Sequence, residues 1–132
     1  TIDAAIGRHS HQRKRMTVKE DGKEAITHYR VIERFPHHTY IRVLLETGRT
    51  HQIRVHMAHL QYPVIGDPLY GGRLQLPPKV SETLKSALRN FKRQALHAFR
   101  LEFYHPVTGE ECHFEIDIPQ DMANFLDVLR NE

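Results

Sequence analysis

The polar residues between Gly48 and Arg54 have the types and the spacing of an anion-binding site. Arg49 and Thr50 follow a run that alternates like a strand and precede a run with helical spacing. Free N–H groups and the helix dipole at a helix N-terminus favour a phosphate, so we expect both residues to face an anion. Arg54 lies one turn later, where a half-shielded guanidinium could bind a carboxylate through two hydrogen bonds. The alternative is a structural arginine that fixes the helix to a sheet.

Three histidines in the same stretch raise the question of a metal site. His51, His56 and His59 are five and three residues apart in the sequence. At about 100° per residue of a helix, the first two point in different directions. The His-Glu-x-x-His pattern of zinc proteases is absent. We therefore expect no metal, and a histidine-based metal hydrolase is a weak functional hypothesis.

Covalent catalysis and nucleotide binding lack their usual motifs. Cys112 is the only cysteine, so neither an internal disulfide nor a cysteine metal cluster can form. It lies in a strand-like run, and we expect a buried structural thiol. No Gly-x-Ser-x-Gly elbow and no Gly-x-x-x-x-Gly-Lys loop occurs in the chain.

A mild basic charge points towards a polyanionic partner. The 132 residues suit one domain or a piece of a larger one, with 19 Lys and Arg against 16 Asp and Glu. The run RHSHQRKR supplies Arg8, Arg13, Lys14 and Arg15, which we expect either to contact RNA or to form a solvated loop. No apolar run approaches the ~20 residues of a membrane span, and no signal peptide is visible. We expect a cytoplasmic protein.

Hydrophobic periodicity predicts the elements that position these residues. Residues 1–23 are expected to form a loop with room for one short strand, and alternating patterns predict strands over 27–35, 38–46, 97–103 and 112–118. The first two strands should form a hairpin. Thr50 and Ser81 are expected to cap two helices, and a third should begin near Pro119. The expected inward-facing residues of the three helices are, in order, Ile53, Met57 and Leu60; Leu84, Leu88 and Phe91; and Met122, Phe125 or Leu126, and Leu129. This order of elements predicts an α+β fold with a mainly antiparallel or mixed sheet and flanking helices.

Two motifs resemble the signature of a known family. The run GRTHQIRVH at 48–56, followed by GDPLYG at 66–71, is similar to the signature of the A-type family of ribosomal large-subunit RNA pseudouridine synthases. Segments such as ITHYRVIERF and the closing RQALHAFRLEFYHPVTGEECHFEIDIPQDM extend the likeness over essentially the whole chain, towards the synthase D subgroup. Ala5 stands where the family pattern has a proline, a departure that we expect to affect only a loop.

The resemblance implies an RNA-modifying enzyme that needs neither cofactor nor metal. Such enzymes isomerise a uridine of ribosomal RNA by breaking its N1–C1′ bond, turning the uracil and rejoining it through C5. The target base is flipped out of its stack into a pocket. An aspartate performs the central chemistry, a tyrosine stacks on the base, and a basic residue pairs with the aspartate.

Matched position by position, the resemblance assigns Arg54 as the basic partner of the aspartate and Ile53 as a wall of the base pocket. Arg49, Thr50, His51 and Gln52 are expected to order the loop and reach RNA. Gly66, Asp67 and Tyr70 are expected to build a structural turn, with Tyr70 packing the loop rather than stacking on a base.

The family's aspartate motif, a His-Arg-Leu-Asp type run, does not occur in this chain. We therefore expect the catalytic aspartate and tyrosine upstream of Thr1, and residues 1–132 to be the C-terminal portion of a catalytic domain that is inactive alone. Its expected partners are large-subunit ribosomal RNA and the missing N-terminal part of the same protein. The alternative from another class is a non-catalytic RNA-binding module.

Overall fold

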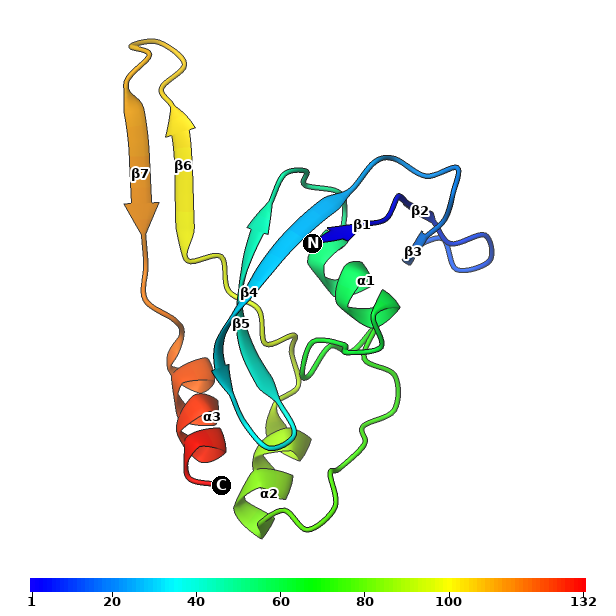
Figure 1. Ribbon diagram of the computed structural model, residues 1–132, viewed down its shortest axis with the longest axis vertical. Coiled ribbons are helices and arrows are strands. Elements are labelled where there is room, and N and C mark those ends of the chain that lie inside the picture. Colours follow the sequence, from blue (N-terminus) through cyan, green and yellow to red (C-terminus); the bar gives the residue numbers. More distant parts are fainter.

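Antiparallel strand pairs and three helices make up the fold in the computed structural model, which describes residues 1–132 (Figure 1). The strands are β1 (Ile2–Asp3), β2 (Ile6–Arg8), β3 (Met16–Val18), β4 (Ile26–Arg34), β5 (Thr39–Leu45), β6 (Arg100–Tyr104) and β7 (Glu111–Glu115). The helices are α1 (Gln52–His59), α2 (Glu82–Asn90) and α3 (Gln120–Arg130). The strands form a sheet of order β1-β4-β5 and two separate pairs, β2-β3 and β6-β7. The α+β class with antiparallel pairing is therefore confirmed.

The N-terminal region is more ordered than its sequence predicts. It contains three short strands instead of a loop with one, because β1 pairs with the distant β4 and β2 pairs with β3. Strands of two or three residues are too short to produce an alternating pattern in the sequence. Ile6 of β2 is almost fully buried and packs in one core cluster with Ala25, Val55 and Tyr70. This cluster attaches the N-terminal region to α1.

The hairpin of β4 and β5 has the predicted position. Its register pairs Thr27 with Leu45 and Arg34 with Thr39, with an irregularity between Val31 and Glu33. One face of β4 lies against α1, where Thr27 is completely buried. This contact sets the position of the helix that carries Arg54.

Helix α1 differs from the prediction at its start and in its buried face. It begins at Gln52, and the preceding residue is His51 in the left-handed conformation (φ 56°), so Thr50 does not cap it. The buried residues are Gln52, Val55, His56 and Met57 rather than the stripe of Ile53, Met57 and Leu60. Polar side chains are tolerated on this face because β4 and the N-terminal segment supply hydrogen-bond partners.

Helices α2 and α3 pack together as the second core, in agreement with their predicted inward faces. The Ser81 hydroxyl caps α2 by accepting a hydrogen bond from the N–H of Leu84 at 3.1 Å. The cluster consists of Val80, Leu84, Leu88, Phe125, Leu126 and Leu129. None of the three helices is both long and apolar enough to cross a membrane.

The hairpin of β6 and β7 extends away from both cores (Figure 1). Phe99, which precedes β6, is half-buried, with the guanidinium of Arg42 over its ring. Every residue of β6 is exposed, so Leu101 and Phe103 of the predicted inward face have no layer over them. The prediction of a buried Cys112 is wrong for the same reason, since this thiol is only half-buried. Alternation in the sequence marks a face that is suited to burial, but it does not supply the element that covers it.

Candidate active site

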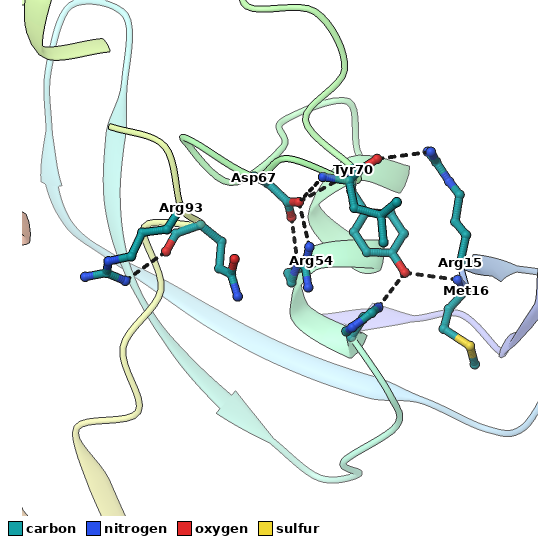
Figure 2. Close-up of polar contacts among 9 residues, drawn as sticks. Arg15, Met16, Arg54, Asp67, Tyr70 and Arg93 are labelled. Carbon is teal, nitrogen blue, oxygen red and sulfur yellow. Dashed lines mark hydrogen bonds and ion pairs between the residues drawn. The ribbon is translucent and has the colours of Figure 1, made fainter. Parts of the chain in front are cut away.

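Arg54 and Asp67 form a bidentate ion pair at the centre of the candidate site (Figure 2). Arg54 Nε lies 2.8 Å from Asp67 Oδ2, and Nη2 lies 2.8 Å from Oδ1. The side chain of Arg54 is 12% exposed and that of Asp67 is completely buried. Breaking a pair this well shielded leaves an uncompensated charge and costs on the order of 3–5 kcal/mol. The sequence predicts that Arg54 pairs with an aspartate outside the chain, but the structure already provides it with one carboxylate from within.

Asp67 also builds the turn that follows it. Its Oδ1 accepts hydrogen bonds from the N–H groups of Leu69 at 2.9 Å and Tyr70 at 3.0 Å. Gly66 has φ +76°, and a Cβ at that position would lie 2.2 Å from the carbonyl oxygen of Arg93, so only glycine fits. Burial raises the pKa of Asp67, but the hydrogen bonds from Arg54, Tyr70 and Leu69 outweigh it, and the net pKa is lowered. The carboxylate is therefore ionised at neutral pH.

Tyr70 is enclosed by polar and cationic groups. The guanidinium carbons of Arg15 and Arg54 lie 5.1 and 5.0 Å from the centre of its ring. Its hydroxyl accepts a hydrogen bond from the N–H of Met16 at 3.0 Å and shares another, of 2.7 Å, with Nδ1 of His51. The ring is 6% exposed, so it connects the turn to the β2–β3 pair and leaves no face for a base.

The backbone of His51 adopts a conformation that residues other than glycine seldom take. Its left-handed backbone (φ 56°) is uncommon although tolerated by histidine, and such positions cluster at functional sites. The hydrogen bond to Tyr70 holds the ring in place. Burial and the nearby Arg54 charge lower the pKa of His51, partly offset by Asp67. The ring is therefore neutral at physiological pH.

Gln52 orders the loop before α1 through hydrogen bonds within the protein. Its Oε1 accepts from the Thr47 hydroxyl at 2.7 Å and the Arg49 N–H at 2.9 Å. Its Nε2 donates to the Ile26 carbonyl and to the Thr27 hydroxyl. The side chain is buried with all four hydrogen-bonding positions used.

A cavity of about 230 Å³ lies beside Arg54. It is lined by Leu45, Gly48, Arg49, His51, Gln52, Ile53, Arg54 and Leu96. Arg49 is held at its rim by a 2.7 Å hydrogen bond from Nε to the carbonyl oxygen of Glu24, and Thr50 is exposed beside it. Apolar walls with a few cationic and amide groups are typical of a small-molecule or base pocket.

The basic loop between β2 and β3 contains three exposed cationic side chains and one that packs against the rest of the protein. Arg8, Arg13 and Lys14 are exposed, with Arg8 Nη1 donating to the Arg13 carbonyl at 2.8 Å. Arg15 is half-buried, donates to the Leu69 carbonyl at 3.0 Å and lies over Tyr70. The guanidinium of Arg15 therefore anchors the loop, and three of the four predicted cations remain free to meet an anion.

No group of three or more His, Cys, Asp or Glu side chains is arranged to hold a metal ion. His56 is completely buried, with Nδ1 2.7 Å from the Thr27 hydroxyl and Nε2 2.8 Å from the Ala4 carbonyl oxygen. Both of its nitrogens are thus occupied by hydrogen bonds within the protein.

Sequence reasoning missed two contributions to the site. It treated Asp67 only as a turn residue, and it did not identify Thr27 and His56 as a buried polar pair. The Gly-Asp-Pro pattern explains the turn but carries no signal for a partner 13 residues earlier. Gln52 and His56 are the polar residues among the four buried positions of α1.

Comparison with known proteins shows what this chain resembles. Residues 1–59 match the family described as RNA pseudouridylate synthase. Two solved human structures share the fold. RNA Pseudouridylate Synthase Domain Containing 4 has a TM-score of 0.70 at 24% identity, covering 98% of this chain and 55% of that one. RNA Pseudouridylate Synthase Domain Containing 1 has a TM-score of 0.59 at 26% identity, covering 99% and 59%.

Two bacterial proteins have a higher sequence identity to this chain. The chain is 57% identical over all its 132 residues to the ribosomal large subunit pseudouridine synthase D of Pseudomonas aeruginosa, covering 41% of that protein. It is 53% identical to the protein of the same name in Escherichia coli, covering 98% of this chain and 40% of the relative. The resemblance to RNA pseudouridine synthases, and within them to the synthase D proteins, is thereby confirmed. The chain spans about two fifths of the length of these relatives.

Proposed function

We propose that this chain is the C-terminal portion of the catalytic domain of an enzyme that converts uridines of large-subunit ribosomal RNA into pseudouridine. The observation that carries the proposal is the position of Arg54, anchored by Asp67 and lining a cavity beside Ile53. A synthase needs a cation at this place to orient and ionise a catalytic carboxylate next to a flipped base. The names of the relatives indicate the substrate class.

In this proposal the residues around the cavity have different roles. Arg54 pairs with a catalytic aspartate from outside the chain, and Ile53 contacts the flipped uracil. Arg49, Thr50 and His51 hold the RNA strand at the cavity rim, where Arg49 supplies positive charge. No metal or cofactor takes part.

The basic loop between β2 and β3 would bind the RNA backbone outside the cavity. Arg8, Arg13 and Lys14 are exposed and belong to no ion pair with an acidic residue. Contacts with phosphates position an RNA without reading its sequence. Choice of the target uridine therefore depends on the shape of the RNA and on the rest of the protein.

Isolated residues 1–132 should bind RNA without catalysis, because the His-Arg-Leu-Asp type run does not occur in them. A non-catalytic RNA-binding module is the second candidate, favoured by the three exposed cations of the basic loop. It predicts that the full-length protein also makes no pseudouridine.

The test compares the full-length protein with the isolated chain on a large-subunit ribosomal RNA transcript, with pseudouridine quantified by mass spectrometry of the digested RNA. We expect product from the full-length protein and none from the chain. Arg54→Ala in the full-length protein should lower kcat by about 10²-fold or more, the loss typical of one preorganised electrostatic contact. The exposed Arg89→Ala on α2 serves as the charge-matched control. Product from the chain alone would contradict the proposed location of the aspartate, and an inactive full-length protein would favour the binding module.

A further inference from the structure

Arg54 and Asp67 differ in their relation to the cavity. The cavity is lined by Arg54 but not by Asp67, whose side chain has no exposed surface. Arg54 is therefore the member of the pair that borders the cavity, and Asp67 is not among the residues that line it.

The pairing with Asp67 uses only one edge of the guanidinium. Nε and Nη2 donate to the two carboxylate oxygens, and neither of these bonds involves Nη1. A guanidinium has five N–H donors in a rigid plane, so fixing one edge also fixes the direction of the remaining donors. The guanidinium carbon of Arg54 also lies over the ring of Tyr70, 5.0 Å from the ring centre.

We propose that Asp67 is a positioning residue, which fixes the Nε–Nη2 edge of Arg54 so that Nη1 is presented to a second carboxylate. This inference rests on the proposed function, in which that second carboxylate is the catalytic aspartate from outside the chain. Asp67 is then more than a turn residue, because the orientation of Arg54 and the net charge of the pair both depend on it.

The charge of the pair has a consequence for the second carboxylate. Arg54 and Asp67 together carry no net charge, so they lower the pKa of a neighbouring carboxyl group less than an unpaired arginine would. Replacing Asp67 with asparagine removes the negative charge and leaves the positive charge of Arg54 uncompensated. The second carboxylate should then lose its proton at a lower pH, although it would be aimed less accurately.

Asp67→Asn separates this role from the role in the turn. The asparagine Oδ1 can still accept from the N–H groups of Leu69 and Tyr70, as Asp67 Oδ1 does. Its amide nitrogen, however, would meet the Nε–H of Arg54 donor to donor, so the Nε–Oδ2 bond of the pair is lost. The turn is retained, and Arg54 is held by the Nη2–Oδ1 bond alone instead of by two bonds.

The chain offers a matched control in a second arginine–aspartate pair of the same geometry. Arg93 Nε lies 2.8 Å from Asp121 Oδ2, and Nη2 lies 2.7 Å from Oδ1. Both side chains are about half exposed and neither lines the cavity. Asp121→Asn therefore removes the same charge and the same type of bond from the surface.

The experiment measures kcat, KM and the pH dependence of kcat for the full-length protein on a large-subunit ribosomal RNA transcript. We expect Asp67→Asn to lower kcat by about 10²-fold, the loss typical of a displaced catalytic group, with KM within about 2-fold. The acidic limb of its pH profile should move to lower pH. Asp121→Asn should match the wild type in all three measurements.

The outcomes distinguish this inference from the proposed function. An Asp67→Asn protein that is folded by circular dichroism and has the kcat and pH profile of Asp121→Asn would overturn the inference alone. If Asp67→Asn does not fold, Asp67→Glu decides, because it keeps the charge and displaces the carboxylate by one methylene group. A reduced kcat with an unmoved acidic limb supports the inference, and a wild-type kcat overturns it. A wild-type protein that makes no pseudouridine overturns the proposed function itself.

Discussion

The hydroxyl of Thr27 lies 2.7 Å from Nδ1 of His56, at a place where neither side chain has any exposed surface. His56 Nε2 lies 2.8 Å from the Ala4 carbonyl oxygen, and Gln52 Nε2 donates to the Thr27 hydroxyl at 2.9 Å. These bonds are mutually consistent when Nε2 of His56 carries the proton. The network joins α1, β4 and the N-terminal segment, and it fixes the helix that carries Arg54.

Thr27→Val tests how much this network stabilises the protein. Valine has the shape of threonine but no hydroxyl, so His56 Nδ1 and Gln52 Nε2 would each lose a buried partner. We expect the free energy of unfolding to fall by about 1–3 kcal/mol, as for other unsatisfied buried groups. Urea unfolding measures it, with Thr27→Ser as the control that keeps the hydroxyl. Equal destabilisation by both variants would show that packing, and not the hydrogen bonds, matters at this position.

The pKa of His51 provides a test of the electrostatics next to the cavity. Burial and the Arg54 charge lower the pKa of this ring, so its midpoint in an NMR titration should lie below the usual value of about 6.5. Because the folded pKa is depressed, the stabilisation from neutral His51 is present above about pH 6.5 and is lost as the pH falls through the lowered pKa. Arg54→Met should raise the midpoint, since it removes a cation and leaves Asp67. A midpoint above 6.5 in the wild type would contradict the description of this site.

Salt dependence tests the proposed RNA contacts of the basic loop. Arg13→Ala combined with Lys14→Ala should weaken binding to a single-stranded RNA and reduce the slope of log K against log salt by about 0.7 for each phosphate that is no longer bound. Filter binding across a range of potassium chloride concentrations gives this slope. Arg89→Ala on α2, a helix that lies apart from the β2–β3 pair (Figure 1), should leave the slope unchanged. An unchanged slope in the double variant would mean that the loop is only a solvated surface.

The apolar face of the β6–β7 hairpin predicts self-association of the isolated chain. Leu101 and Phe114 are direct cross-strand neighbours, and they are 60% and 58% exposed. Uncovered apolar faces and unpaired strand edges favour association with other chains. We expect dimers or larger species of residues 1–132 at micromolar concentration by light scattering. Leu101→Lys with Phe114→Lys should shift them towards monomer, and a monodisperse wild-type monomer would contradict this prediction.

Much of the fold could be predicted because its signals are local. The β4–β5 hairpin follows from two alternating runs joined by a bend, and α2 follows from the Ser81 cap and the spacing of Leu84 and Leu88. The face of α1 could not be predicted in this way. Its buried polar residues are stable there only because Thr27 and Ala4, far away in the sequence, supply their partners.

The same distinction between local signals and distant contacts applies to the candidate site. The sequence by itself determined that Arg54 follows a loop at a helix start, that Gly66 and Asp67 form a turn, and that the motifs resemble one family, because these are properties of neighbouring residues. Only the tertiary structure decided that Asp67 is the carboxylate that binds Arg54, that Gln52 is buried, and that Arg15 docks on Tyr70. Each of these contacts depends on which segments fold against one another. The sequence around a charged or hydrogen-bonding side chain does not show which distant residue will become its partner.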